Sequence, residues 1–216
     1  MKEPSPPFPE GMFHVKHEAW GRWSEVLGFR IDAPMADRLD RYEQLLLEKA
    51  LPLGMIARGD RGQLRERHIV DSLRGATLLG PGPGRVVDLG SGAGLPGIPL
   101  AIARQDLTFR LADLRKRRVA FMELAVDSLG LSNVTVFAGK VERLTGRFDG
   151  CLSRAFAEVD RAWTIAEQLL SPTGKLLFWA GRSFDVGAGV PAGARISVSA
   201  APGLADAGPV VIMSRQ

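Results

Sequence analysis

The stretch Asp88-Leu-Gly-Ser-Gly-Ala-Gly-Leu-Pro-Gly97 decides how the rest of this 216-residue chain is interpreted. It follows a short apolar run that ends at Leu89 and precedes a helical pattern from Leu95 to Arg104. Glycines between a strand and a helix let a ligand approach the backbone closely, and amides at the helix start can hold its polar groups. We therefore expect a ligand-binding loop at the carboxyl end of the first strand of an α/β sheet.

Strand and helix patterns alternate after this loop, which predicts right-handed βαβ units around a parallel sheet. The predicted strands are short apolar runs at residues 85–89, 109–113, 134–138, 148–153 and 175–179. The predicted helices cover residues 95–104, 116–129 and 159–170. Two further strands, 195–200 and 210–214, are expected to close the sheet through a turn around Pro202-Gly203.

The chain before the sheet has a different character. Prolines at positions 4, 6, 7 and 9 deny the start of the chain regular hydrogen bonding, so we expect a mobile tail over residues 1–18. An amphipathic helix from Pro34 to Leu51, with Asp32 as its N-cap, and a second helix over 62–79 predict an N-terminal helical appendage at residues 19–84. Residues 85–216 then form the domain that carries the ligand loop.

Composition narrows the class of protein. Hydrophobic residues make up 45% and charged residues 24% of the chain, which argues against disorder, collagen-like repeats and coiled coil. Cys151 is the only cysteine, so an intramolecular disulfide is impossible and a reducing compartment is expected. Because no apolar run is long enough to cross a bilayer, we expect a cytoplasmic protein without membrane contact. The net charge of +4 fits a polyanionic partner but does not decide for one.

The glycine pattern is compatible with more than one adenosine-containing cofactor. Gly92-Ala-Gly-Leu-Pro-Gly97 matches the G-x-G-x-x-G pattern of dinucleotide-binding loops, and Asp113 follows about 20 residues later, where such loops have a ribose-binding acid. The pattern does not choose between nicotinamide and another adenosine cofactor. A tight turn without a ligand, and an ordinary acid at a strand end, are the structural alternatives.

Four blocks of sequence indicate the protein family more specifically than the glycine pattern does. They are Arg67-His-Ile-Val-Asp-Ser72, Val87 to Leu100, Asp113 to Phe121 and Phe148-Asp-Gly-Cys-Leu-Ser-Arg-Ala-Phe156. The acid-x-Gly-x-Gly-x-Gly loop, with an acid ending the second strand, resembles class I S-adenosylmethionine-dependent methyltransferases. Together the four blocks resemble the bacterial small-subunit ribosomal RNA guanine-N7 methyltransferases, also called glucose-inhibited division protein B. Residues 48–56 depart from that family, because they lack its usual Trp-Asn and Asn-Leu-Thr stretches.

The resemblance implies a fold, a reaction and a cofactor. The fold is a Rossmann-like class I methyltransferase sheet, mostly parallel with helices on both faces, an antiparallel C-terminal strand and an N-terminal helical appendage. The reaction is methyl transfer from S-adenosyl-L-methionine to N7 of a guanosine in small-subunit (16S) ribosomal RNA. Carried over by position, the cofactor-binding residues are Asp88, Gly90, Gly92, Leu95, Asp113, Val141, Glu142 and Arg154. Among them, Asp113 would bind the ribose hydroxyls.

Arg154, His68 and Asp71 are the candidates for the catalytic region. Arg154 follows the fourth predicted strand, where an arginine can stack on a base or bind guanine O6 and phosphate. Pairing with an acid is its structural alternative. His68 and Asp71 share a helix face, and they either line a pocket or form a satisfied core pair. Guanine N7 already offers a lone pair, so in-line displacement requires positioning rather than a base or a metal, and we expect no metal site.

Basic side chains cluster in two places that can meet RNA phosphates. The first cluster comprises Arg58, Arg61, Arg65, Arg67 and Arg74, and the second comprises Arg115, Lys116, Arg117 and Arg118. We assign RNA binding to Arg67 and to the second cluster, for which a solvated face is the alternative. The expected partner is ribosomal RNA, alone or within a ribonucleoprotein or small subunit, and the protein is expected to be a monomer. An NAD(P)-dependent oxidoreductase and a non-catalytic RNA-binding protein are the alternative functions.

Overall fold

The computed structural model describes residues 20–185, 191–201 and 203–216. The predicted tail, residues 1–18, lies outside these ranges, and so does Pro202 of the predicted final turn.

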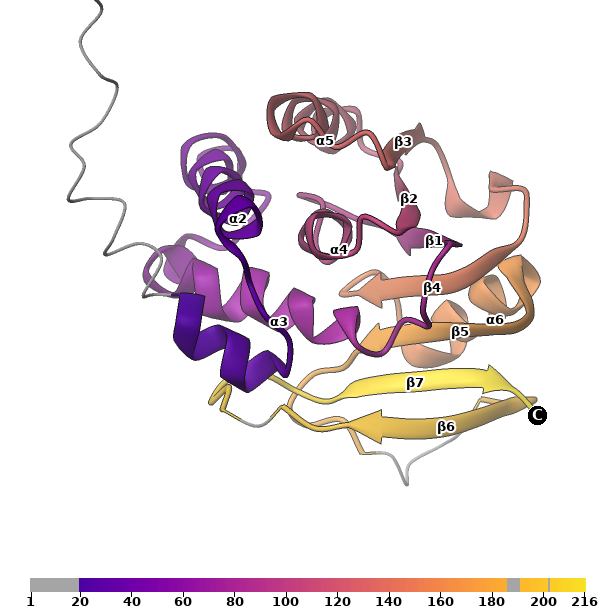
Figure 1. Ribbon diagram of the computed structural model, residues 1–216. Helices are drawn as coiled ribbons and strands as arrows, with labels where there is room; N and C mark the ends of the chain where they lie inside the picture. The colour runs from indigo at the N-terminus through magenta and orange to yellow at the C-terminus, as the bar shows by residue number, and fades with distance from the viewer. Residues whose placement is uncertain (1–19, 186–190, 202) are drawn as a thin grey trace, which may run out of the picture.

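A seven-stranded sheet in the order β3-β2-β1-β4-β5-β7-β6 forms the centre of the protein (Figure 1). Its strands are β1 Gly84–Leu89, β2 Leu107–Asp113, β3 Val134–Ala138, β4 Phe148–Arg154, β5 Leu170–Trp179, β6 Ala194–Ser199 and β7 Val210–Arg215. β1 to β5 are parallel, and β7 runs antiparallel to both β5 and β6. This confirms the predicted mostly parallel sheet with an antiparallel C-terminal strand.

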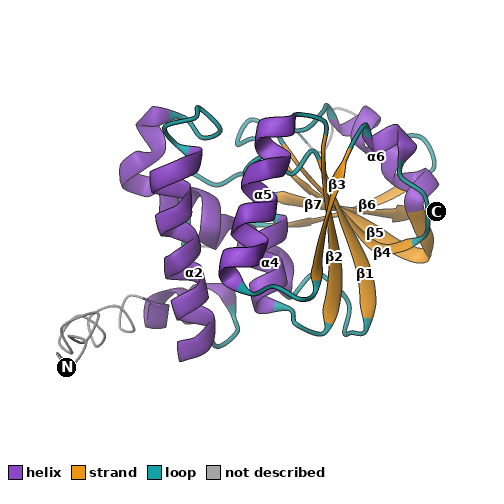
Figure 2. Ribbon diagram, turned by 90° about the horizontal axis from the view of Figure 1, so that it is seen from above, coloured by secondary structure: helices purple, strands orange, loops and turns teal. Residues whose placement is uncertain are grey.

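Helices cover both faces of the sheet (Figure 2). α4 Gly97–Ala103 and α5 Lys116–Leu129 lie on one face, and α6 Val159–Leu169 lies on the other. Successive side chains of a strand point to opposite faces, so Val86 joins the core under α4 while Val87 joins the core under α6. Because parallel strands end at the same edge, the loops after β1, β2, β4 and β5 gather there.

The N-terminal helices pack against α4 and α5 and share one core with them. Residues 20–27 are helical, and α2 Ala33–Leu45 continues into a π-helical turn, η1 Leu46–Ala50. The predicted N-cap is confirmed, because the Asp32 carboxylate accepts a hydrogen bond from the Met35 amide at 2.9 Å. The division of the chain at residue 84 stays a prediction.

The prediction of one α-helix across residues 62–79 was wrong in detail. The segment consists of η2 Arg58–Gln63, η3 Arg65–Val70, α3 Asp71–Leu73 and η4 Arg74–Ala76, of which η2 and η4 are 3-10 and η3 is a π-helix. Close packing on the end of β5 holds it: a Cβ on Gly75 would lie 2.8 Å from the Trp179 indole, which donates a hydrogen bond to the Asp71 carbonyl at 2.9 Å. The segment thereby reaches the carboxyl edge of the sheet.

Among the helices in the described ranges, none combines the length and the apolar character needed to span a bilayer.

Candidate functional site

The loop of residues 88–97, called the glycine loop below, leaves the end of β1 with three glycines in the left-handed region. Their φ angles are +70° at Gly90, +61° at Gly92 and +84° at Gly94. L side chains rarely adopt this conformation, which explains the choice of glycine. A Cβ on Gly92 would meet only the Gly90 carbonyl oxygen, at 3.9 Å, so the backbone at Gly92 faces open space. At Gly90 the Phe156 ring already occupies the position, 2.4 Å from where a Cβ would lie.

Asp113, at the end of β2, is joined to this open backbone. Its Oδ2 accepts a hydrogen bond from the Gly92 amide at 3.1 Å, and its Oδ1 accepts one from the Arg115 amide at 2.8 Å. Nη1 of Arg118 lies 3.3 Å from Oδ2. The structure thus brings Asp113 to the glycine loop, as the sequence pattern predicts.

Asp88 lies on the inner side of the same loop and is only 1% exposed. Its Oδ2 accepts a hydrogen bond from the Gly97 amide at 3.0 Å, while its Oδ1 has no hydrogen-bond partner among the described residues. Burial raises the pKa of Asp88 to about 7, against the hydrogen bond from Gly97, which lowers it. Asp88 therefore fastens the start of α4 to the end of β1.

The remaining predicted cofactor contacts have different surroundings. Leu95 is half-buried against the main core, and Val141 is buried at the start of the short helix η5 Val141–Arg143. Glu142 is exposed and pairs at 3.2 Å with Arg161 of α6. The described protein contacts therefore do not hold the Glu142 carboxylate at the glycine loop.

The Arg154 side chain leaves the end of β4 and binds the η3–α3 segment. Its Nη2 donates to the Arg67 carbonyl at 2.7 Å, and its Nη1 donates to the His68 carbonyl at 3.2 Å. It also forms an ion pair with Asp71 at 3.5 Å. Burial lowers the pKa of Arg154, and Asp71 opposes that shift. The structure thus brings together all three residues that were predicted for the catalytic region.

His68 is held on both ring nitrogens. Nη2 of Arg154 lies 3.2 Å from Nδ1, and Asp60 lies 2.9 Å from Nε2. A guanidinium only donates, so Nδ1 accepts and Nε2 carries the proton that is donated to Asp60. Burial, followed by the charge of Arg154, lowers the pKa of His68 and favours the neutral ring. Asp71 pairs in addition with Arg74 at 2.6 Å.

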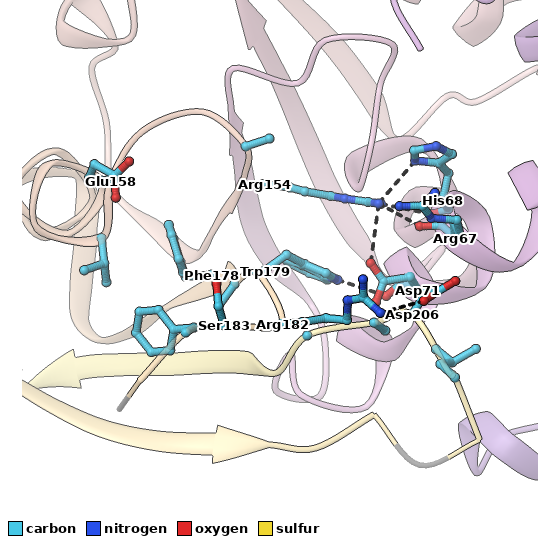
Figure 3. A pocket seen from close by; sticks show the side chains of 18 of the residues that line it. Arg67, His68, Asp71, Arg154, Glu158, Phe178, Trp179, Arg182, Ser183 and Asp206 are labelled. Atoms are coloured by element: carbon cyan, nitrogen blue, oxygen red, sulfur yellow. Dashed lines mark hydrogen bonds and ion pairs between the residues drawn. The ribbon is translucent and has the colours of Figure 1, made fainter. Parts of the chain in front are cut away.

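A cavity of about 560 Å³ opens between these residues and the ends of β4 and β5 (Figure 3). We call it the β4–β5 cavity. Its polar lining includes Arg67, His68, Asp71, Arg154, Glu158 and Arg182. Figure 3 shows Arg67 and His68 on the side opposite to Glu158, with Arg154 between them.

Several residues of this cavity were missed by the sequence analysis. Phe178 lies at the end of β5, and Glu158, Arg182 and Phe184 lie in the loops after β4 and β5. That position at the carboxyl edge of the sheet was the available signal. A further unusual feature is Ala155, a non-glycine residue with φ of +51°, which also lines the cavity. Left-handed backbone of this kind is uncommon outside glycine and clusters at functional sites.

The predicted RNA-binding residues fall into two groups. Arg115, Lys116 and Arg117 are exposed and border a groove of about 330 Å³ next to Leu53 and Met55. Arg118 is half-buried against Asp113.

In the N-terminal cluster, Arg67 is 43% exposed and pairs with Asp60. Arg65 and Arg74 are not placed to meet phosphates. Arg65 pairs with Asp40 and Glu43, while Arg74 is 8% exposed and binds Asp71 and the Gly208 carbonyl.

Comparison with known proteins identifies the family. The family model GidB, described as rRNA small subunit methyltransferase G, matches residues 35–188. A Mycobacterium leprae protein named ribosomal RNA small subunit methyltransferase G is 39% identical over 77% of this chain and 74% of its own length. An Anaeromyxobacter dehalogenans protein of the same name is 38% identical over 78% of this chain and 80% of its own length.

Solved structures support the fold. The crystal structure of a SAM-dependent methyltransferase from Aquifex aeolicus superimposes with a TM-score of 0.54 at 18% identity, covering 72% of this chain and 95% of that one. On the family match and the two relatives, the chain belongs to the GidB family, the rRNA small subunit methyltransferase G proteins.

Proposed function

We propose that this protein transfers a methyl group from S-adenosylmethionine to N7 of a guanosine in small-subunit (16S) ribosomal RNA. Membership of the GidB family carries this proposal. The structure supports it with an open backbone at Gly92, beside the buried carboxylate of Asp113, and with the β4–β5 cavity at the same edge of the sheet.

The residues around the glycine loop fit the cofactor chemically. A carboxylate has about four acceptor positions, and three protein N–H groups occupy three of them at Asp113. The longest contact, from Arg118 at 3.3 Å, is the most readily exchanged for a ribose hydroxyl. We assign cofactor contacts to Gly90, Gly92, Leu95, Asp113, Val141 and Glu142, and we assign Asp88 the task of positioning the loop.

Methyl transfer to guanine N7 requires the protein mainly to position the two reactants. When bound, S-adenosylmethionine supplies an electrophilic methyl group on a sulfonium. Guanine N7 already has a lone pair, so no residue needs to remove a proton. This agrees with the surroundings of His68, whose acceptor nitrogen faces Arg154 and whose other nitrogen faces Asp60. We therefore propose His68, Asp71 and Arg154 as positioning residues that hold the η3–α3 segment against β4.

RNA contacts are proposed for Arg67 and for the exposed residues Arg115, Lys116 and Arg117. These side chains can neutralise phosphates and make affinity salt-dependent. Arg118, the fourth residue of this predicted cluster, is half-buried and contacts Asp113 as well. Cytoplasmic location and a monomeric state stay predictions.

The experiment has two stages. Calorimetric titration with S-adenosylhomocysteine and, separately, with NADH tests the cofactor, and binding of NADH alone would support the oxidoreductase alternative. Transfer of a tritiated methyl group is then measured on naked 16S RNA and on small subunits that lack the modification. Mass spectrometry of the nucleosides should show N7-methylguanosine. RNA binding without any methyl transfer would support the non-catalytic alternative instead.

A further inference from the structure

The β4–β5 cavity has the size of a site for one nucleotide. Its volume of about 560 Å³ lies within the usual range of small-ligand pockets, roughly 300–1,000 Å³. It adjoins the glycine loop, because Phe156, which follows the cavity residue Ala155, lies against Gly90. Proteins read RNA sequence mostly on unstacked, single-stranded bases. A base that enters this cavity would therefore come to lie beside the cofactor loop.

One part of the cavity wall is aromatic. The rings of Phe178 and Phe184 lie 6.2 Å apart between centroids and are tilted by 49°. Phe178 is buried, whereas Phe184 is half-buried and can offer part of its ring surface to a ligand. Aromatic side chains are the usual stacking partners of splayed-out bases.

The acidic side chains of the cavity differ in whether they have an ion-pair or hydrogen-bond partner. Asp71 is held by Arg74 and Arg154, and Asp206 pairs with Arg182 at 2.8 Å. Glu158 is the N-cap residue of α6, but its side chain makes no capping hydrogen bond. In the described ranges no hydrogen bond or ion pair of the Glu158 carboxylate is observed. Its acceptor oxygens are therefore available to a ligand.

The position of Glu158 follows from an unusual turn. Ala155, with its φ of +51°, directs the chain so that Phe156 lies on Gly90 and Glu158 faces the cavity. Glu66 also lines the cavity, and it is the neighbour of the cation Arg67 in the chain. Figure 3 shows Glu158 apart from the cluster of Arg67, His68 and Asp71.

We propose that the β4–β5 cavity binds the target guanine and that Glu158 accepts hydrogen bonds from its N1–H and N2–H groups. This rests on the function proposed above and names the residue that recognises the base. Guanine N7 and O6 lie on one edge of the ring and the N2 amino group lies on the opposite edge. A carboxylate at N1–H and N2–H therefore leaves N7 free. Adenine has no such pair of neighbouring donors.

The charge balance of the transfer supports a carboxylate at this place. The methyl carbon leaves the sulfonium sulfur and bonds to N7, no proton is exchanged, and the positive charge passes to the guanine ring. The sulfur leaves as a neutral thioether. An anionic Glu158 at the other edge of the ring stabilises that developing positive charge.

The first test compares Glu158→Gln with Asp160→Asn. Asp160 is an exposed carboxylate in the first turn of the same helix and does not line the cavity. Glu158→Gln should lower kcat/KM for methyl transfer to small-subunit RNA by about 5- to 100-fold, the range for a bidentate base contact. Affinity for S-adenosylhomocysteine should not change in either variant, and Asp160→Asn should keep normal transfer. Equal losses in the two variants would overturn the assignment, because only the charge at the helix start would then matter.

The second test asks about the base itself and does not depend on turnover. Calorimetric titrations with 5′-GMP and 5′-IMP are made in the presence of S-adenosylhomocysteine, since IMP lacks only the N2 amino group. The unmodified protein should bind GMP about fivefold or more tightly than IMP, because a hydrogen bond to a charged acceptor is lost. In Glu158→Gln the two affinities should become equal. A GMP preference that survives in this variant, or its absence in the unmodified protein, overturns the proposal. Absence of methyl transfer by the unmodified protein would instead refute the proposed function.

Discussion

The glycine loop and the β4–β5 cavity lie at the same edge of one sheet, but they are built in different ways. In the glycine loop, backbone groups from one short stretch and one acid, Asp113, form the open surface. In the cavity, side chains from the η3–α3 segment, β4 and β5 meet. Arg154 there binds the carbonyl of His68, which lies 86 positions earlier in the chain. We expect backbone changes to damage the loop together with the fold, and side-chain changes in the cavity to reduce methyl transfer much more than cofactor affinity.

The largest effect is expected from Gly90→Ala. The added Cβ meets the Phe156 ring, and the left-handed backbone strains any L residue, so stability should fall by roughly 2 to 5 kcal/mol and cofactor binding should be lost. Gly130→Ala is the matched control, because Gly130 has φ of +62° with nothing near its Cβ position. Urea unfolding and calorimetry measure both quantities. If both variants lose the same stability, the contact with Phe156 contributes nothing.

Asp88→Asn tests the inner side of the glycine loop. The pKa of Asp88 is about 7 in the folded protein, against 3.8 ordinarily. Between pH 3.8 and 7, Asp88 therefore keeps its proton in the folded protein but has lost it in the unfolded chain. Stability of the unmodified protein therefore falls as pH rises from about 4 to 7. The charges facing Asp88 are those of Arg154 and Asp113, with the neutral Tyr42 beside them.

The Asp88→Asn variant should lack this fall and be more stable than the unmodified protein at pH 8, by up to about 4 kcal/mol. Unfolding curves at pH 5 and pH 8 measure the difference. Identical pH dependence of the two proteins would mean that Asp88 titrates normally.

Arg154→Ala tests the cavity side of the comparison. Without the guanidinium, the η3–α3 segment loses its hydrogen bonds to β4, and transfer should fall about 100-fold, as displaced reactants commonly cause. Affinity for S-adenosylhomocysteine should fall much less. Arg154→Lys keeps the charge but not the planar fork and should give an intermediate rate. Equal losses in transfer and cofactor affinity would assign Arg154 to the cofactor alone.

Asp113→Ala should weaken S-adenosylhomocysteine binding by about 1 to 3 kcal/mol, because the ribose hydroxyls and the Gly92 amide lose their acceptor. Asp106→Ala, an exposed acid at the opposite edge of the sheet, is the control. Calorimetry provides the measurement. Unchanged affinity in Asp113→Ala removes this residue from the cofactor site.

The smallest effect is expected at the surface beside the two sites. Replacing Arg115, Lys116 and Arg117 by Gln should flatten the dependence of log affinity for RNA on log salt, by about 2 to 3 in slope if each meets a phosphate. Arg118 is left intact because it contacts Asp113. Filter binding at several salt concentrations measures the slope, and an unaltered slope makes this run a solvated face.

Local sequence predicted the sheet elements well. β3 and α5 have the predicted bounds, Val134–Ala138 and Lys116–Leu129. Cys151, within the apolar run of β4, is buried. The π-helical and 3-10 turns between Arg58 and Ala76 were not predicted. The last of these turns packs Gly75 closely against Trp179, a long-range contact that no local pattern contains.

The sequence by itself determined the parallel sheet, the glycine loop with Asp113 and, through its four blocks, the family. These features depend on neighbouring residues, because hydrophobic period and glycine conformation act within a few positions. Only the tertiary structure decided that Arg154 binds the backbone of the η3–α3 segment, that Arg65 and Arg74 are used in internal pairs, and that Glu158 faces the cavity without a partner. The physical reason is that side-chain partners are chosen by long-range packing, and residues far apart in the chain meet only after the sheet has formed.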